Sequence, residues 1–199
     1  MGLFNKNQNQ QAQPFSQRQQ LERRYASARM NLLWVVLFTA INIVLLVSNS
    51  YTYFLFSAFI PYAIVDYGMI VCGKYPADFY GDLGQFQFFD TTVLVVLIAV
   101  AAVICVLYLL CWIFSKKRRV AWLIVGLVFF ALDTVFMLLG GISADRILDI
   151  VFHGWVIISL TGGIIAHSKL KKLPEEEPAP VAEPVQTEET ASGEELTQS

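Results

Sequence analysis

Four long apolar runs dominate the chain and restrict what it can fold into. Residues 31–48, 91–114, 120–140 and 147–166 carry almost no charge, and each run is eighteen to twenty-four residues long. At a rise of about 1.5 Å per residue, a helix of this length spans the roughly 30 Å hydrocarbon core of a bilayer. Only 15% of all residues are charged, and 56% are hydrophobic. The sequence therefore predicts an all-α polytopic membrane protein with four transmembrane helices.

A fifth apolar stretch, residues 53–72, is long enough to cross the membrane but contains Pro61 near its middle. Proline inside a helix removes a backbone hydrogen bond and clashes with the preceding turn, so we expect two short helices, 53–60 and 62–72. Broken backbone at membrane depth must be buried in protein or face water. These helices would form a re-entrant or interfacial hairpin, followed by an external aromatic loop over residues 73–90. A kinked but ordinary span is the alternative.

The distribution of Lys and Arg favours the first of these arrangements. If residues 53–72 do not cross, eleven Lys and Arg residues near the spans fall on one side, and only Lys74 and Arg146 fall on the other. If they do cross, the split is six against seven. Because Lys and Arg of short loops collect on the cytoplasmic side, we expect four spans, both termini cytoplasmic, and residues 49–90 outside.

Both ends of the chain have compositions typical of disordered segments. Residues 1–29 begin rich in Asn and Gln and become basic and helix-prone from Gln17 onward, while residues 174–199 hold eight of the sixteen acidic residues. Neither segment can bury enough apolar surface to offset the entropy lost on ordering. We therefore expect disordered tails on either side of a membrane domain at 30–173. The acidic C-terminal tail is a candidate surface for a protein partner.

The sequence lacks the motifs of most soluble chemistry. It contains no phosphate-binding loop, dinucleotide fingerprint, zinc-protease motif or nucleophile elbow. Its two His and three Cys residues have no metal-ligand spacing. The basic clusters border the spans, where orientation and contact with anionic lipid explain them better than nucleic acid does. We expect no enzyme activity, cofactor or metal, and no nucleic-acid partner.

A small set of ionisable residues lies inside the last two spans and is the candidate polar site. Asp133 lies seven residues from the end of its span and His153 six residues into the next, at depths of about 10 and 9 Å. Asp149 precedes His153 by four residues and shares its helix face, and Asp66 of the fifth segment would join them. The matched depths predict that Asp133 and His153 touch. Such a pair is either a structural hydrogen bond of about 0.6–2 kcal/mol or a functional site.

Other polar and small residues in the spans are expected to serve helix packing. Thr39 and Asn42 lie inside the first span, where an amide or hydroxyl usually bonds a neighbouring helix. Ser159 and Gly163 form a small-xxx-small pair, which lets helix backbones approach closely. For these four residues the sequence predicts structural roles.

The chain resembles a group of small multispanning bacterial membrane proteins, mainly from Gram-positive organisms, whose function is unassigned. The resemblance lies within residues 31 to 173 and rests on the stretches YFLFSAFIPY, LYLLCWIFSKKRRVAWLI, FALDT and DIVFHGW. It implies a bacterial plasma-membrane protein. It implies no activity, cofactor or active-site residue.

Two classes of function remain open on this sequence. The first is a non-enzymatic accessory or scaffold module, which would recruit a protein partner through its acidic tail or its helix faces. The second is a small transporter or transporter subunit, in which Asp133 and His153, with Asp66, would exchange a proton or hold a cation. Besides these partners, the chain is expected to contact the lipid bilayer itself.

Overall fold

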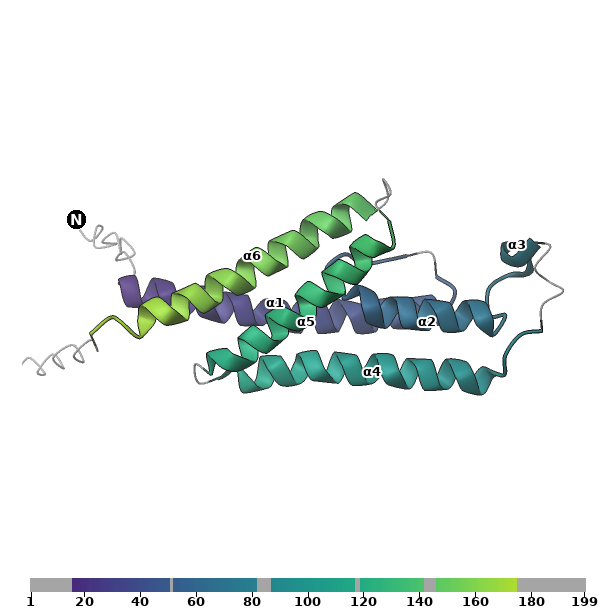
Figure 1. Cartoon of the computed structure of the whole chain (residues 1–199), viewed down its shortest axis with the longest axis horizontal. Coiled ribbons are helices and arrows are strands. Elements are labelled where there is room, and N and C mark those ends of the chain that lie inside the picture. The colour runs from purple at the N-terminus through teal and green to yellow at the C-terminus, as the bar shows by residue number, and fades with distance from the viewer. Residues whose placement is uncertain (1–15, 51, 82–86, 117–118, 142–145, 175–199) are drawn as a thin grey trace, which may run out of the picture.

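The computed structural model describes residues 16–50, 52–81, 87–116, 119–141 and 146–174, and in this part of the chain every regular element is a helix (Figure 1). Four helices, α1, α4, α5 and α6, are long and apolar enough to cross a membrane. The elements in chain order are α1 (Gln17–Val47), α2 (Phe59–Val71), α3 (Ala77–Tyr80), α4 (Thr91–Phe114), α5 (Val120–Leu139) and α6 (Ile147–Leu170).

The first span is the second half of a longer helix. α1 begins at Gln17, where the Ser16 side chain accepts a hydrogen bond from the Gln19 N–H, and it runs for 31 residues. At about 46 Å it exceeds the hydrocarbon core of a bilayer by several turns. The basic stretch at 17–29, which we assigned to a disordered tail, is therefore helical. The remaining parts of the two predicted tails, 1–15 and 175–199, lie outside the described residues.

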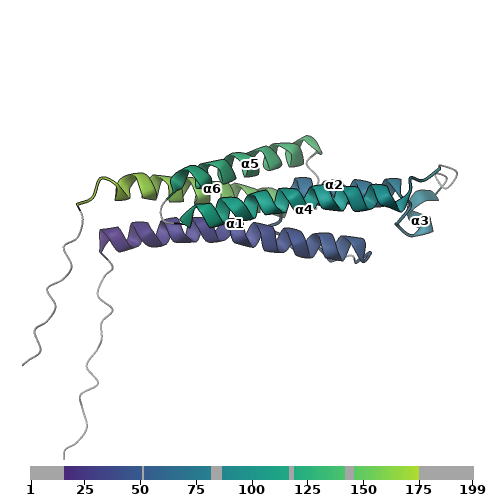
Figure 2. The same cartoon turned by 90° about the horizontal axis from the view of Figure 1, so that it is seen from below.

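Most of the Lys and Arg residues near the spans lie at one end of the bundle. The start of α1 and the end of α6 lie together at this end, and α3 lies at the opposite end (Figure 2). The Tyr25 hydroxyl donates to the Ser115 carbonyl at 2.8 Å, and the Arg29 guanidinium donates to the Ser115 hydroxyl at 2.8 Å and to the Trp112 carbonyl at 3.2 Å. Residues in the first four turns of α1 thus donate to backbone carbonyl groups at the end of α4, where intrahelical donors are lacking.

The chain leaves the α3 end of the bundle after Asn49 and returns to it at Lys74. The Asn49 side-chain amide donates to the Lys74 carbonyl at 3.2 Å, which joins the two ends of the segment. Between them, residues 52–58 run back along α1 without forming a helix, and α2 then returns toward α3 (Figure 1). Our prediction of a helix at 53–60 is therefore wrong. Pro61 does not break a helix but sits in the first turn of α2, where its missing N–H costs nothing.

Small residues bring α1 and α6 into close contact. A Cβ atom on Gly163 would collide with the Cβ of Ala28. One turn away, the Asn31 amide donates to the Ser159 hydroxyl at 2.6 Å. The predicted packing role of the Ser159 and Gly163 pair is confirmed, and the main core forms from this contact together with α4 and α5.

Candidate functional site

The Asp133 carboxylate lies against the start of α2. It projects from α5 and is 1% exposed. Its Oδ2 accepts from the Phe59 N–H and its Oδ1 from the Ile60 N–H, both at 2.7 Å. A helix N-terminus carries partial positive charge, so the carboxylate meets both the free N–H groups and the dipole of α2. Asp133 therefore caps a helix that begins 74 residues earlier in the chain.

The whole N-terminus of α2 is satisfied by this kind of bond. An α-helix leaves its first four N–H groups without intrahelical partners. In α2 the N–H of Ala58 donates to the Thr39 hydroxyl at 2.7 Å, the next two donate to Asp133, and Pro61 has no N–H. No water is required at this helix start. The arrangement suits a backbone that begins a helix inside a bundle of apolar helices.

The extended residues before α2 are held by Asn42 of α1. The Asn42 side-chain amide donates to the Phe54 carbonyl at 2.7 Å, and its side-chain oxygen accepts from the Phe54 N–H at 2.8 Å. The amide side chain thus pairs with backbone as a neighbouring strand would. Thr39 and Asn42 were predicted to bond another helix, but they bond non-helical backbone, which in lipid would cost several kcal/mol if left unpaired.

His153 of α6 completes the cluster. Its Nε2 lies 3.3 Å from Asp133 Oδ2, its Nδ1 lies 2.8 Å from the Asp149 carbonyl oxygen, and its ring stacks on Phe130 with centroids 4.9 Å apart. The side chain is 2% exposed. The contact that matched depth predicted between Asp133 and His153 is present, within a larger assembly that the sequence did not reveal.

The two contacts of His153 constrain where hydrogens can lie in this pair. A carbonyl oxygen can only accept, so Nδ1 carries a hydrogen that it donates to Asp149. The contact between Nε2 and Asp133 Oδ2 is a hydrogen bond only if a second proton lies between them. The pair is then electrically neutral as a whole, either as carboxylate and imidazolium or as carboxylic acid and imidazole. Because the pair carries no net charge, burying its two ionisable groups costs less free energy of desolvation.

The remaining predicted site residues lie apart from this pair or take part through their backbone. Asp149 contributes its carbonyl group. Asp66 lies about two turns farther along α2, where its carboxylate accepts a hydrogen bond from the Tyr75 hydroxyl. Burial and the neighbouring Asp66 raise the pKa of Tyr75 above its usual range. Asp66 therefore belongs to a separate surface at the α3 end.

That surface borders a cavity of about 270 Å³. Its walls come from the end of α1, the extended segment, α2 and the residues before α3, among them Asn49, Thr52, Tyr53, Tyr62 and Tyr75. No group of three or more His, Cys, Asp or Glu residues with a geometry suited to a metal ion occurs among the described residues.

Comparison with known proteins identifies no relative of the chain. No family model, curated protein or solved structure matches the chain. The candidate site therefore stands on its own geometry.

Proposed function

We propose that the chain is a non-enzymatic accessory or scaffold module of a bacterial plasma membrane, with the acidic tail at 174–199 available to a cytosolic partner. The supporting observation is that three polar side chains of the membrane domain all bond the same stretch of backbone. Thr39, Asn42 and Asp133 all bond the backbone between residues 54 and 60. Their chemistry serves to hold one unusual segment in place, as a structural role requires.

The topology that accompanies this proposal has both termini in the cytoplasm and residues 49–90 on the outer side. The meeting of Asn49 with Lys74 supports it, because a spanning segment would separate these residues by the thickness of the bilayer. The basic end of the bundle would face the cytoplasm, following the usual bias of Lys and Arg. Residues 52–58 and α2 would then be a re-entrant segment, with its deepest point at the Asp133 cap.

The second candidate function is a transporter subunit that moves a proton through Asp133 and His153. The observation in its favour is the proton that a hydrogen bond between their side chains requires. Ionisable pairs buried in a membrane domain are typical of proton relays. The same pair caps α2, so loss of its proton would change the charge at that helix start.

A flux assay on the full chain separates the two proposals. Purified protein is reconstituted in liposomes that enclose a pH-sensitive dye, and an imposed proton gradient is followed for the wild type, Asp133→Asn and the control Cys105→Ser. The scaffold proposal predicts decay no faster than in empty liposomes. Faster decay in the wild type and in Cys105→Ser that Asp133→Asn abolishes, with equal amounts of folded protein recovered from the liposomes, would establish the transporter instead.

The recruiting role of the tail is tested in cells. Deletion of residues 175–199 should leave the amount of inserted protein unchanged, because the described helices make the core without them. A partner that crosslinks to the full chain in stoichiometric amount should no longer do so after the deletion. An undiminished crosslink would place the partner on the helix faces, and loss of inserted protein would contradict the proposed independence of the tail.

A further inference from the structure

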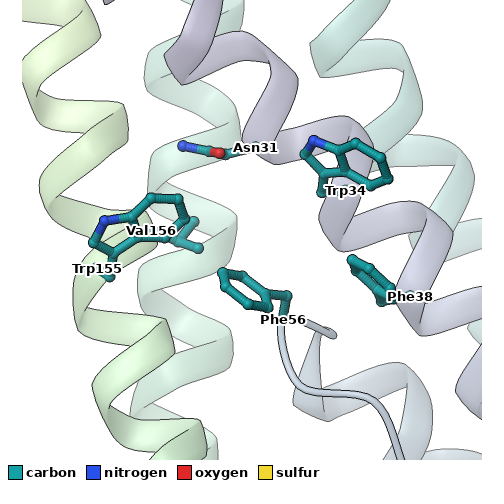
Figure 3. Close-up of a pocket in the computed structure, with 6 residues that line it drawn as sticks. All are labelled: Asn31, Trp34, Phe38, Phe56, Trp155 and Val156. Carbon is teal, nitrogen blue, oxygen red and sulfur yellow. The ribbon is translucent and has the colours of Figure 1, made fainter.

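A groove between α1 and α6 contains a cavity whose lining is mostly aromatic. The cavity measures about 300 Å³, and its walls are almost entirely apolar. Trp34 and Trp155 form its rims and are 46% and 50% exposed. Figure 3 shows Phe56 reaching from the extended segment into the space between the two helices, opposite Trp155. The cavity therefore opens on the outer surface of the bundle, where the acyl chains of a bilayer would lie.

The position of Phe56 gives the floor of this cavity a fixed shape. Its φ of 71° is one that a bulky residue adopts only at a cost of roughly 1–2 kcal/mol. The ring stands edge-on to Trp155, with centroids 5.5 Å apart, and lies 4.0 Å from the Phe152 ring. A rigid aromatic surface of this kind binds an apolar chain without first having to become ordered.

A cationic side chain lies over the same groove, two turns closer to the basic end. A side chain on Gly162 would begin 3.4 Å from the Arg24 Nε, so the guanidinium reaches across the groove onto α6 where that glycine leaves room. Arg24 and Asn31 are seven residues apart and share a face of α1, as Gly162 and Trp155 do on α6. Among the described residues, no hydrogen bond or ion pair occupies the Arg24 guanidinium.

The distance along α6 between the Arg24 guanidinium and the aromatic cavity fits within the thickness of one membrane leaflet. Gly162 lies about 6 Å before Ala166, the end of the apolar run, which puts the guanidinium near the boundary between headgroups and hydrocarbon. Trp155 lies about 10 Å deeper along α6. A phosphate at Arg24 would therefore leave an acyl chain running directly into the aromatic cavity.

We propose that this groove binds an anionic glycerophospholipid of the leaflet at the basic end, with its phosphate at Arg24 and one acyl chain between Trp34 and Trp155. The basis for the choice is charge: the apolar cavity accepts any acyl chain, whereas the uncompensated guanidinium favours a headgroup of net negative charge. This site is independent of the function proposed above.

Native mass spectrometry of the full chain in mild detergent tests the site. Phosphatidylglycerol and phosphatidylcholine with identical acyl chains are added in separate experiments, and glycerol 3-phosphate is added at the same concentration to probe the headgroup alone. We expect one phosphatidylglycerol to be retained per chain, and neither of the others. Equal retention of the two lipids, or retention of glycerol 3-phosphate, would overturn the proposal.

Two pairs of variants assign the binding to the groove. Arg24→Gln should lower phosphatidylglycerol retention about fivefold, the effect expected of one basic residue near an anionic surface, while Arg119→Gln, an equal loss of charge at the start of α5, should not. Trp155→Ala should lower retention, whereas Trp122→Ala on α5 should not. Equal losses within either pair would refute the site. Arg24→Lys should keep most of the binding, which guards against a folding defect in Arg24→Gln.

Discussion

Two helices of this protein begin at an aspartate carboxylate, but the two caps differ in every other respect. α4 begins after Asp90, whose side chain accepts from the Thr92 N–H two residues away at 2.8 Å and lies in the exposed connection. α2 begins against Asp133, which comes from another helix and is 1% exposed. Water can replace the first carboxylate but cannot reach the second. The capping bond therefore stabilises only the first turn of α4. In α2, the same kind of bond is required for the whole segment 52–71 to hold its conformation.

The largest expected effect comes from removing both acceptors at the buried cap. Asp133→Leu leaves the N–H groups of Phe59 and Ile60 and the Nε2 of His153 unpaired. Breaking a buried pair of this kind costs about 3–5 kcal/mol. Unfolding in mild detergent, followed by tryptophan fluorescence, should show this loss, whereas Asp90→Leu in the same assay should be far milder. Equal losses at the two caps would show that burial does not distinguish them.

A double-mutant cycle sharpens the same comparison. Asp133→Leu and His153→Leu should be strongly non-additive, because the first change already strands the ring that the second removes. The pair Asp90→Leu and His153→Leu serves as control and should add within about 0.3–0.5 kcal/mol, as expected of residues that share no partner. Additive losses for Asp133 with His153 would mean that their 3.3 Å contact contributes no coupling.

Asp133→Asn should fall between these extremes, at a cost of about 1–3 kcal/mol. If Asp133 bonded His153 alone, this change would be mild, since an amide can still bond imidazole. In the structure the two carboxylate oxygens serve two different N–H groups, and an amide offers one oxygen and one NH₂ that would oppose an N–H. A melting temperature indistinguishable from the wild type would show that the cap tolerates an unpaired donor.

Thr39→Val should cost about 1–3 kcal/mol, because it keeps the shape of the side chain but removes the acceptor for the Ala58 N–H. Thr39→Ser, which keeps the hydroxyl, is the matched control and should lose much less. The measurement is again unfolding in mild detergent. If valine is tolerated as well as serine, the N–H of Ala58 has another partner.

The smallest effect is expected at Asp90, and it should depend on pH. Its hydrogen bonds from the Thr92 side chain and backbone lower the pKa of this carboxyl below its usual value. The folded pKa is then below the unfolded value of about 3.9, so the contribution of Asp90 is fully present above that value and is lost as pH falls through the lowered folded pKa. The free energy of unfolding of the wild type and of Asp90→Asn is compared as a function of pH. The difference between them should shrink from about pH 5 down to the acid limit of the assay. A constant difference would contradict a role for the charge.

The four spans could be predicted because length and apolar content suffice to identify a transmembrane helix, and the same reasoning placed the start of α4 at Thr91. The sequence from Gln17 is helix-prone, but that it forms one helix with the first span was not predicted, since hydropathy does not reveal how far a helix continues beyond the apolar region. The helical break was assigned to Pro61 by its mid-segment position. In fact Pro61 marks the first turn of a helix, a position that proline favours and tolerates.

The candidate site was predicted in part. Equal depth in adjacent helices was enough to pair Asp133 with His153. The role of Asp133 as a cap could not be predicted, because it depends on where α2 begins. One signal was present: a proline in a first turn removes one of the four free N–H groups and leaves three others that need acceptors inside an apolar bundle. Thr39 accepts from one of these N–H groups and Asn42 bonds Phe54. These partners became clear only once residues 52–58 were seen to be non-helical.

The central claim, that the capped segment enters and leaves on one side of the membrane, is tested most directly by cysteine labelling in intact cells. Single cysteines replace Ser50, Ala77 and Lys171 in a background without Cys72, Cys105 and Cys111, and an impermeant maleimide is added from outside. The account predicts labelling at positions 50 and 77, and at position 171 only after the membrane is permeabilised. Labelling of position 50 but not 77 would show that the segment crosses the membrane and would contradict the account.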